Sequence, residues 1–269
     1  MSSSANPLGT ALVTGASSGI GAVYADRLAR RGHDLVLVAR SGERLQALAT
    51  QLAAQTGRRV EVLPADLTKP HDRQRVAQRL ATDADIGLLV NNAGFNLASS
   101  IVDSSPERLD EMIQLNVVAL THLARAIAPR LAKQGRGAII NISSIAALAP
   151  SLLNGTYGGT KAYVLNFTQA LHQEIGAKGV KLQAVLPGAT RTDFWKLAGM
   201  PVEHLPSEIV MSAEDMVDAS LVAFDQGELV TIPSLPDAAV WQAFETARGA
   251  LGPFLSSRTP AKRYQRAGA

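Results

Sequence analysis

No cysteine occurs among the 269 residues of this sequence. This absence excludes disulfide bonds, thiolate nucleophiles and metal sites built on cysteine. It also fits a reducing compartment, and we expect the protein to be cytoplasmic. The five histidines are scattered and form no His-Glu-x-x-His pair. The sequence therefore predicts no metal site.

Long apolar runs and clusters of one charge are also missing. No segment reaches the ~20 apolar residues that cross a bilayer, and the polar N-terminus lacks the charged-then-apolar order of a signal peptide. Lys and Arg total 26 and Asp and Glu total 23, which leaves a net charge of +3 dispersed along the chain. We therefore expect neither a membrane nor nucleic acid as a partner.

What the sequence does contain is a regular alternation of short apolar runs with longer helical patterns. With 46% hydrophobic residues it has enough apolar surface for one large core. The predicted strands are Thr10–Thr14, Asp34–Ala39, Val60–Ala65, Gly87–Asn91, Gly137–Ile142, Lys181–Leu186 and Glu228–Ile232. The predicted helices cover 20–31, 41–56, 70–82, 106–134, 155–178 and 213–226. This order predicts an α/β fold, a doubly wound Rossmann-type sheet of about seven parallel strands with helices on both faces.

We expect one domain over residues 1–269, because no repeat or linker divides the chain. Segment 193–212 carries one glycine and two prolines, and is interpreted as a substrate lid. Residues 233–269 form a C-terminal extension with helical spacing of Trp241, Phe244, Ala247 and Leu251. This helix either packs on its own domain, contacts another subunit or covers the substrate pocket.

A glycine-rich stretch, Thr14-Gly15-Ala16-Ser17-Ser18-Gly19-Ile20-Gly21, joins the first predicted strand to the first predicted helix. The free N–H groups and positive dipole end of a helix suit a pyrophosphate, and glycine lets the backbone approach it closely. The stretch predicts a dinucleotide cradle formed by Gly15, Ser17, Ser18, Gly19, Ile20 and Gly21. The alternative is a glycine-rich turn that only closes a strand–helix junction.

The acid that usually holds the ribose 2′-hydroxyl is missing from the end of the second predicted strand. Ala39 and Arg40 stand there, while Asp34 lies at the opposite end of the strand. A cation without an acid suits a 2′-phosphate, so we expect NADP(H) in preference to NAD(H). Ser41 or Arg44 would assist. The alternative is that Arg40 is a solvated loop residue.

Tyr157 and Lys161 are separated by one helical turn, and Ser144 lies upstream of them. Residues i and i+4 share a helix face, so the lysine can lie beneath the tyrosine. A nearby cation favours the ionised form of a phenol, whose ordinary pKa is ~10. Together the three side chains predict a proton-transfer site. The tyrosine and lysine alone would also fit an ordinary surface pair.

The cradle, the stretch Asn91-Asn92-Ala93-Gly94 and the Ser/Tyr/Lys set together resemble the short-chain dehydrogenase/reductase family over residues 9–192. The resemblance implies hydride transfer between a nicotinamide and a carbonyl or secondary alcohol, in a homo-oligomer (dimer or tetramer). It implies four catalytic residues: Asn116, Ser144, Tyr157 and Lys161. Asn116 would hold a water, Ser144 would bond the substrate oxygen and Tyr157 would be the acid or base. Lys161 would bind the nicotinamide ribose and lower the pKa of Tyr157.

The resemblance also implies further cofactor contacts. Asp66 and Leu67 would contact the adenine, and the adenine ribose would lie along Asn92, Ala93 and Gly94. The nicotinamide carboxamide would lie against Pro187, Gly188, Thr190 and Thr192. Two departures from the family pattern are the pair Gly158-Gly159, which indicates close packing, and the stretch 228–237, which makes a tetramer less certain.

An apolar set of side chains flanks the expected pocket: Phe95, Leu148, Leu153, Phe194 and Trp195. These favour a small neutral ketone, aldehyde or alcohol as substrate, although ordinary packing would look the same. Arg191 and Lys196 would instead favour an anionic substrate. Two other functions stay open, a non-catalytic NADP(H)-binding sensor and an epimerase or dehydratase. The short segment after residue 192 leaves little room for the substrate domain of the latter.

Overall fold

The computed structural model describes residues 8–264. Residues 1–7 and 265–269 lie outside the described part, and with them most of the polar N-terminal segment. The chain divides into two compact units, Met1–Pro233 and Ser234–Ala269. The division falls next to residue 233, where the predicted C-terminal extension begins.

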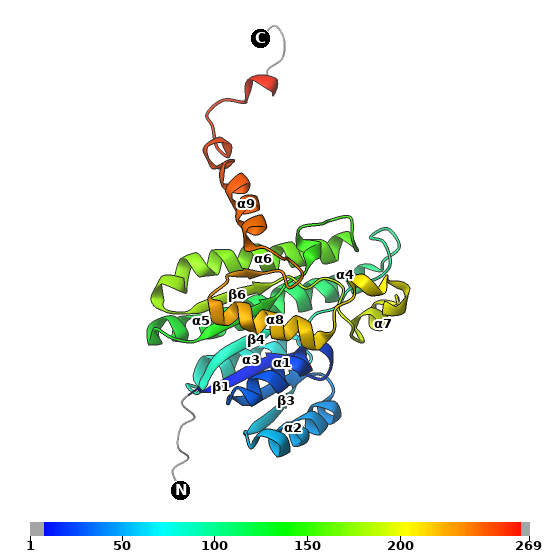
Figure 1. The fold of residues 1–269 in the computed structure, drawn as a ribbon, viewed down its shortest axis with the longest axis vertical. Helices are drawn as coiled ribbons and strands as arrows, with labels where there is room; N and C mark the ends of the chain where they lie inside the picture. Colours follow the sequence, from blue (N-terminus) through cyan, green and yellow to red (C-terminus); the bar gives the residue numbers. More distant parts are fainter. Residues whose placement is uncertain (1–7, 265–269) are drawn as a thin grey trace. The chain divides into compact units, whose positions relative to one another are not determined.

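The first unit contains a sheet of parallel strands, as the sequence predicts (Figure 1). The order across the sheet is β3-β2-β1-β4-β5-β6-β7. The strands are β1 (Thr10–Thr14), β2 (Asp34–Ala39), β3 (Val60–Pro64), β4 (Ile86–Asn91), β5 (Ala138–Ile142), β6 (Lys181–Val185) and β7 (Val230–Thr231). The order reverses between β1 and β4, and their carboxyl ends form the switch point where ligands bind in doubly wound sheets.

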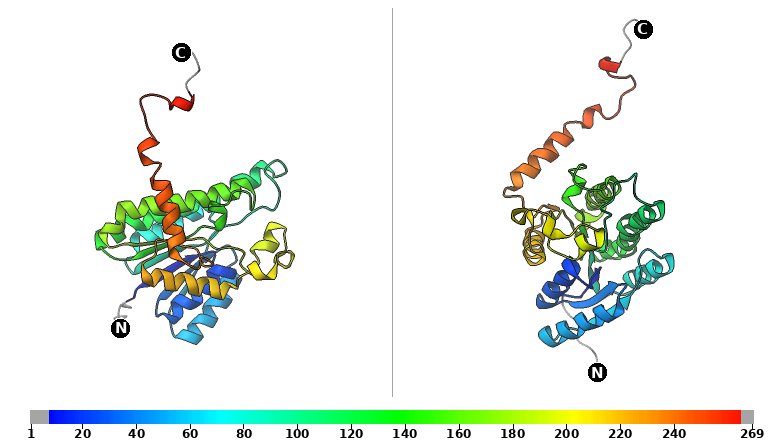
Figure 2. Two further views of the ribbon diagram at one scale, coloured as in Figure 1. Left: turned by 45° about the horizontal axis from the view of Figure 1, so that its top comes forward. Right: turned by 90° about the vertical axis from the view of Figure 1, so that its right-hand side faces the viewer.

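Helices cover both faces of this sheet (Figures 1 and 2). They are α1 (Gly19–Arg30), α2 (Gly42–Thr56), α3 (Pro70–Thr82), α5 (Leu120–Gln134), α6 (Gly155–Ile175) and α8 (Ala213–Gln226). One core joins alternate strand residues such as Val13 to α1, α2 and α8. The other joins residues such as Leu12 to α3, α5 and α6. The predicted doubly wound fold is confirmed.

The long helix predicted over 106–134 is interrupted. Helix α4 (Pro106–Ile113) passes into a π-helical turn (Gln114–Ala119), and α5 follows. A π turn contains an extra residue, which side-chain periodicity does not reveal. The predicted helix over 155–178 likewise ends at Ile175, followed by a 3₁₀ turn (Gly176–Lys178).

Segment 193–212, the predicted lid, contains the short helix α7 (Phe194–Ala198) and two 3₁₀ turns (Val202–His204 and Ser207–Ile209). A parallel bridge pairs Thr190, which precedes the segment, with Met211 near its end. The segment is therefore a loop that leaves the carboxyl end of β6 and returns beside it.

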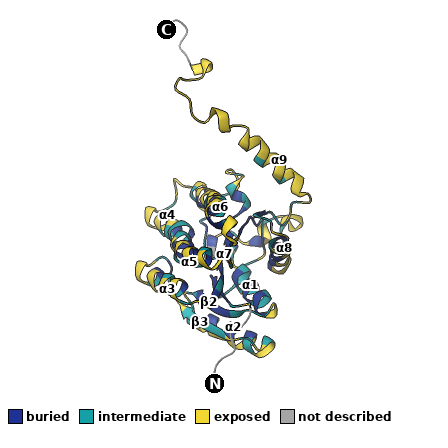
Figure 3. Cartoon of the chain, turned by 90° about the vertical axis from the view of Figure 1, so that its left-hand side faces the viewer, coloured by how far each residue is buried: buried dark blue, intermediate teal, exposed yellow. Residues whose placement is uncertain are grey.

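The second unit contains helix α9 (Ala238–Gly249), which has no buried residue (Figure 3). Asp237 caps it by accepting a hydrogen bond from Ala239 N–H at 2.8 Å. Val240, Phe244 and Leu251 are about half exposed, at 56%, 47% and 55%. Among the residues described, no helix is both long and apolar enough to span a membrane.

Candidate active site

The turn between β1 and α1 has no room for side chains at its glycine positions. Gly15 has φ +66° and Gly19 has φ +53°, in the left-handed region that favours glycine. A Cβ at Gly21 would lie 2.3 Å from the Gly15 carbonyl oxygen, and one at Gly19 would lie 3.0 Å from a Thr192 methyl. Helix α1 starts directly after Ser18, whose side chain makes no capping hydrogen bond. The bare backbone and uncapped helix start fit a dinucleotide pyrophosphate.

The Asn-Asn-Ala-Gly stretch holds this turn against the end of β4. Thr14 Oγ1 accepts hydrogen bonds from Asn92 N–H at 2.9 Å and from Ala93 N–H at 3.0 Å. In return, Asn92 Nδ2 donates to the Thr14 carbonyl oxygen at 2.9 Å. Residues 92 and 93 therefore lie at the switch point beside Gly15.

Arg40 is exposed directly after β2, next to the half-buried Ala39. Ser41 caps α2 by accepting a hydrogen bond from Arg44 N–H at 3.3 Å. Arg40 thus places a cation at the end of β2, where an acid would hold a ribose 2′-hydroxyl.

The loop after β3, where Asp66 and Leu67 are expected to contact an adenine, is held by hydrogen bonds within the loop and from the first turn of α3. Asp66 accepts from Thr68 N–H at 3.0 Å, and its own N–H donates to Asp72 at 2.8 Å. The buried Arg73 guanidinium donates to the carbonyl oxygens of Leu67 and Thr68 at 3.1 and 2.8 Å. Arg73 was not predicted to be a site residue, because nothing in the sequence distinguishes it from an ordinary arginine on a helix surface.

Asn116 lies in the π-helical turn and is 1% exposed. Its amide donates to the Phe95 carbonyl oxygen at 3.0 Å and to Thr160 Oγ1 at 3.1 Å, and accepts from Phe95 N–H at 3.1 Å. A Cβ at Gly94 would lie 3.0 Å from Asn116 Oδ1 and 3.5 Å from Lys161 Nζ. Asn116 and Lys161 therefore both lie close to Gly94.

Tyr157, Lys161 and Ser144 are all buried, at 5%, 5% and 7% exposure. Lys161 Nζ lies 5.6 Å from the centre of the Tyr157 ring and donates to the Ile142 carbonyl oxygen at 2.9 Å. Ser144 precedes a 3₁₀ turn (Ile145–Ala147) and accepts from Ala146 N–H at 3.1 Å. The phenol, the ammonium and the hydroxyl therefore come together from α6 and the end of β5.

Lys161 is expected to lower the pKa of Tyr157, but the net change in this structure is a rise. Burial raises the pKa of Tyr157 to about 12, and the hydrogen bond with Ser144 opposes this only in part. Burial also lowers the pKa of Lys161 to about 8. Both changes have the same cause, because a site shielded from water disfavours the charged form of each group. The phenol is consequently protonated at neutral pH.

The segment after β6 closes the site from the other side. Ile145 N–H donates to the Pro187 carbonyl oxygen at 3.1 Å, which joins this segment to the residue next to Ser144. Gly188 lies near Ile145, since a Cβ there would be 3.8 Å from its methyl group. Thr190 is buried, and Thr192 reaches Gly19 in the cradle. The expected carboxamide residues thus lie between the cradle and Ser144.

The expected substrate residues divide into three groups. Phe95, Leu153 and Phe194 pack in an apolar cluster around Tyr157, and the Tyr157 and Phe194 rings are 5.9 Å apart. Trp195 is buried and donates its ring N–H to the Thr190 carbonyl oxygen at 2.9 Å, so it anchors α7. Leu148 is 37% exposed and is not part of the cluster.

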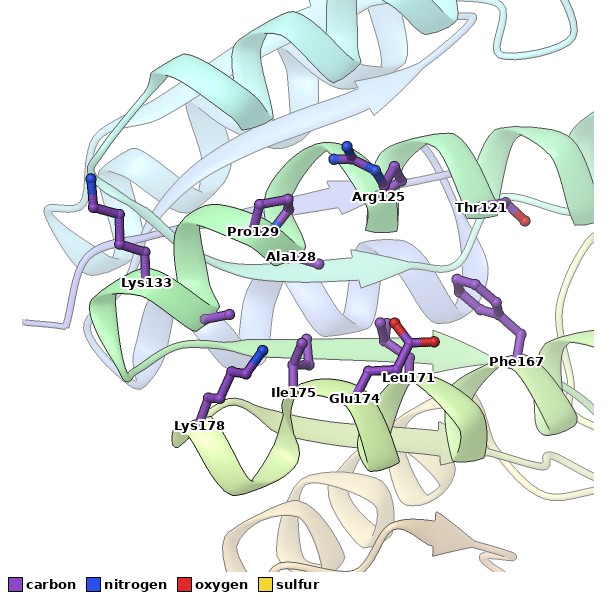
Figure 4. A pocket seen from close by; sticks show the side chains of 11 residues that line it. Thr121, Arg125, Ala128, Pro129, Lys133, Phe167, Leu171, Glu174, Ile175 and Lys178 are labelled. Carbon is purple, nitrogen blue, oxygen red and sulfur yellow. The ribbon is translucent and has the colours of Figure 1, made fainter.

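A separate groove of about 590 Å³ lies between α5 and α6 (Figure 4). Its walls include Arg125 and Pro129 of α5 with Phe167 and Leu171 of α6. None of the expected site residues lines it, so volume alone does not locate the reaction centre. Within residues 8–264, no cluster of His, Cys, Asp or Glu could hold a metal ion.

Comparison with known proteins identifies close relatives of this architecture. A family model described as short chain dehydrogenase matches residues 9–200. The structure of a short-chain dehydrogenase from Sphingobium yanoikuyae in complex with NADPH is 50% identical, covering 96% of this chain and 100% of that chain with a TM-score of 0.93. That of the bulky-bulky ketone specific alcohol dehydrogenase from Comamonas testosteroni is 44% identical, covering 96% of this chain and 99% of that chain with a TM-score of 0.89.

A curated relative is human 17-beta-hydroxysteroid dehydrogenase type 3, which is 36% identical over 213 residues. The match includes 78% of this chain but only 66% of the human protein. An uncharacterized oxidoreductase from Staphylococcus epidermidis is 37% identical over 207 residues, 74% of this chain and 88% of that protein.

Proposed function

Because the chain belongs to the short-chain dehydrogenase family, we propose that it reduces bulky neutral ketones with NADPH and uses Tyr157 as the proton donor. Membership makes it an oxidoreductase that acts on alcohols and carbonyls with a nicotinamide cofactor. The proton donor, the choice of NADPH and the substrate class are inferences from the site.

One observation carries the assignment of Tyr157: a buried phenol with a pKa of about 12 is hydrogen-bonded to Ser144 and lies beside Lys161. A bound nicotinamide supplies the hydride. Tyr157 donates its proton to the ketone oxygen as negative charge develops there, and the Ser144 hydroxyl donates a second hydrogen bond to the same oxygen. The Lys161 ammonium then stabilises the tyrosinate that remains.

The preference for NADPH rests on Arg40 and on the absence of an acid at the end of β2. The guanidinium would pair with the 2′-phosphate, while the cradle from Gly15 to Gly21 would hold the pyrophosphate. The Sphingobium relative was crystallised with NADPH, which agrees with this inference. We expect kcat/KM to be at least tenfold higher with NADPH than with NADH.

Arg40→Asp tests this preference. An acid at this position would repel the 2′-phosphate and accept a hydrogen bond from a 2′-hydroxyl, so the ratio of kcat/KM values should shift toward NADH. Arg44→Gln tests the assisting role of the neighbouring arginine. Comparable kcat/KM values for the two cofactors in the wild-type protein would contradict the assignment.

A bulky neutral ketone fits the apolar cluster of Phe95, Leu153 and Phe194 beside Tyr157. The Comamonas relative is described as specific for bulky-bulky ketones, which favours this class. Steady-state rates with a diaryl ketone, a small aliphatic ketone and a keto acid would compare the candidates. A preference for the keto acid would point instead to Arg191 and Lys196.

Replacement of Tyr157 by phenylalanine tests the proton donor. Loss of a general acid costs roughly 10²–10⁴-fold in rate, so we expect at least a hundredfold fall in kcat with the NADPH dissociation constant little changed. Tyr163→Phe is the matched control, because Tyr163 lies on the same helix and its hydroxyl pairs with Thr121. Wild-type turnover by folded Tyr157→Phe protein would rule out this role. NADPH binding without turnover of any carbonyl by the wild type would favour the sensor function.

Contact between copies of this chain stays a prediction from the family resemblance. Light scattering of the full chain would give its mass in solution, and a monomer at micromolar concentration would contradict the expected dimer or tetramer.

A further inference from the structure

Asn154 is a buried polar residue to which neither the sequence motifs nor the proposed chemistry gives a role. It is 8% exposed and caps the N-terminus of α6. Its amide oxygen accepts hydrogen bonds from Thr156 N–H at 2.9 Å and from Tyr157 N–H at 3.4 Å. The backbone of the proposed proton donor is therefore held directly by this side chain.

The other end of the same amide reaches a different part of the chain. Asn154 Nδ2 donates to the Ser99 carbonyl oxygen at 2.6 Å, in the segment 95–104 between β4 and α4. Inside this segment, the Ser99 and Ser104 hydroxyls pair at 2.7 Å and Ser104 also donates to the Ser100 carbonyl oxygen at 2.7 Å. The segment is thus a small internally bonded loop that Asn154 fastens to α6.

The residue before Ser99 fastens the same loop to the predicted lid. Ala98 N–H donates to the Ala198 carbonyl oxygen of α7 at 2.9 Å. At the start of the segment, Phe95 packs in the cluster that contains Tyr157 and Phe194. Consecutive residues therefore connect α7 on one side and the first turn of α6 on the other.

We propose that Asn154 is a positioning residue that ties segment 95–104, and through Ala98 the lid helix α7, to the turn that carries Tyr157. The tie fixes the distance between Phe95, Phe194 and the phenol, and so sets the fit of a bulky substrate. This inference rests on the proposed function and deepens it, since it concerns the same pocket. Asn154 itself need not touch the substrate.

An amide is the side chain that this position requires. It offers an acceptor for the two N–H groups of α6 and a donor for the Ser99 carbonyl oxygen at once. Aspartate keeps the acceptor and remains a good helix cap, but it loses the donor. Serine also caps a helix, but it is too short to reach Ser99. Asn154→Asp and Asn154→Ser therefore remove the tie while keeping the cap.

Hydrogen exchange measures the tie without any enzyme assay. In Asn154→Asp we expect amide exchange at least fivefold faster than in the wild type in peptides covering 96–104 and 194–200. Protection should be unchanged in the middle of α6, around 164–171. Unchanged exchange in both peptides would overturn the proposal. Asn154→Ser repeats the measurement if the aspartate variant does not fold.

Kinetics measure the consequence for the substrate. We expect Asn154→Asp to raise KM for a diaryl ketone about tenfold, with KM for a small aliphatic ketone and the NADPH dissociation constant within twofold of wild type. An equal change for both ketones would indicate general damage to the site and would overturn the proposal.

Arg130→Met provides a purely structural control. Arg130 donates to the carbonyl oxygens of Leu80 and Ile86, at the opposite end of the sheet, so its loss should lower Tm without altering the ratio of the two KM values.

Failure of the proposed function would look different. The wild-type protein would then reduce no ketone, while hydrogen exchange would still report whether Asn154 holds the loop.

Discussion

At the scale of single residues, burial determines the chemistry of the site more than the contacts between its members do. The Tyr157 phenol and the Lys161 amine are both shielded from water, so each is pushed toward its neutral form. Their i, i+4 spacing predicted that the two residues share a helix face, and the structure brings them together on α6. The rise in the pKa of Tyr157 could not be predicted in this way, because it depends on burial, which the spacing does not encode.

Burial of Lys161 should make stability rise with pH. The pKa of Lys161 is about 8 in the folded protein and 10.5 in the unfolded chain. Between these values the unfolded chain binds the extra proton, so the free energy of unfolding increases as pH rises through this window. Below pH 8 the buried charge costs roughly 3 kcal/mol, at about 1.4 kcal/mol for each pH unit between the two values.

Lys161→Met should therefore be more stable than wild type at pH 7, by about 1–3 kcal/mol once the lost hydrogen bond to Ile142 is counted. The difference should shrink toward pH 10. Urea denaturation at pH 7 and pH 9.5 measures it, and Lys181→Met, at an exposed lysine, is the control. The same stability gap at both pH values would contradict the assigned pKa.

At the scale of elements, turns and interruptions were harder to predict than strands. Helix α3 and helix α8 have the predicted bounds, because proline and serine mark their starts. The π-helical turn at Gln114–Ala119 was missed, since the apolar side chains continue through it at helical spacing. The family resemblance nevertheless drew attention to Asn116, whose catalytic role stays a prediction. Asn154 was not identified, because a helix cap that also holds a distant loop has no sequence signature.

The two glycines after Tyr157 have different surroundings. A Cβ at Gly158 would lie 3.3 Å from the Ala146 carbonyl oxygen, whereas one at Gly159 would have no atom within 4 Å. The expected close packing therefore applies to Gly158 alone.

Gly159→Ala should raise the free energy of unfolding by about 0.5–1 kcal/mol with kcat unchanged, because alanine favours a helix and nothing blocks it. Gly158→Ala should gain less and should lower kcat, since it pushes the turn that follows Ser144. Urea denaturation and steady-state rates distinguish the two. Equal behaviour of the two variants would show that the contact with Ala146 is unimportant.

The cradle permits an equally direct test. Gly21→Ala places a methyl group 2.3 Å from the Gly15 carbonyl oxygen, so the turn must open. We expect the NADPH dissociation constant to rise at least tenfold, as measured by fluorescence titration. Gly159→Ala, which adds the same methyl group to open space, should bind NADPH normally. Unchanged binding by Gly21→Ala would place the pyrophosphate elsewhere.

At the scale of the whole molecule, the sheet could be predicted almost completely. Unbroken apolar strands such as Leu35–Val38 belong to a parallel sheet buried on both faces, and the alternation with helices predicts right-handed crossovers between the strands. The division next to residue 233 falls where the sequence analysis begins the C-terminal extension, although the sequence alone led us to expect one domain.

Every described residue of the cradle and of the proton-transfer site lies in the first unit. We therefore expect a chain ending at Pro233 to bind NADPH with a dissociation constant within twofold of the full chain and to unfold within a few degrees of it. Titration and thermal unfolding test this, and light scattering of both chains shows whether the second unit holds copies together. Loss of NADPH binding on truncation would mean that the second unit contributes to the cofactor site.

The π-helical turn has a consequence for how this chain can vary. It holds one residue more than the α-helix around it would need, so deleting any single residue between 114 and 119 would allow a regular helix to run from α4 into α5. Because the π turn absorbs its extra residue locally, the helical turns on either side would keep the faces that they bury, whereas the side chains inside the turn would change direction. Asn116 would turn away from Phe95 and Thr160 while the protein kept its core. Active variants of this protein should therefore tolerate substitutions between residues 114 and 119 far better than deletions or insertions there.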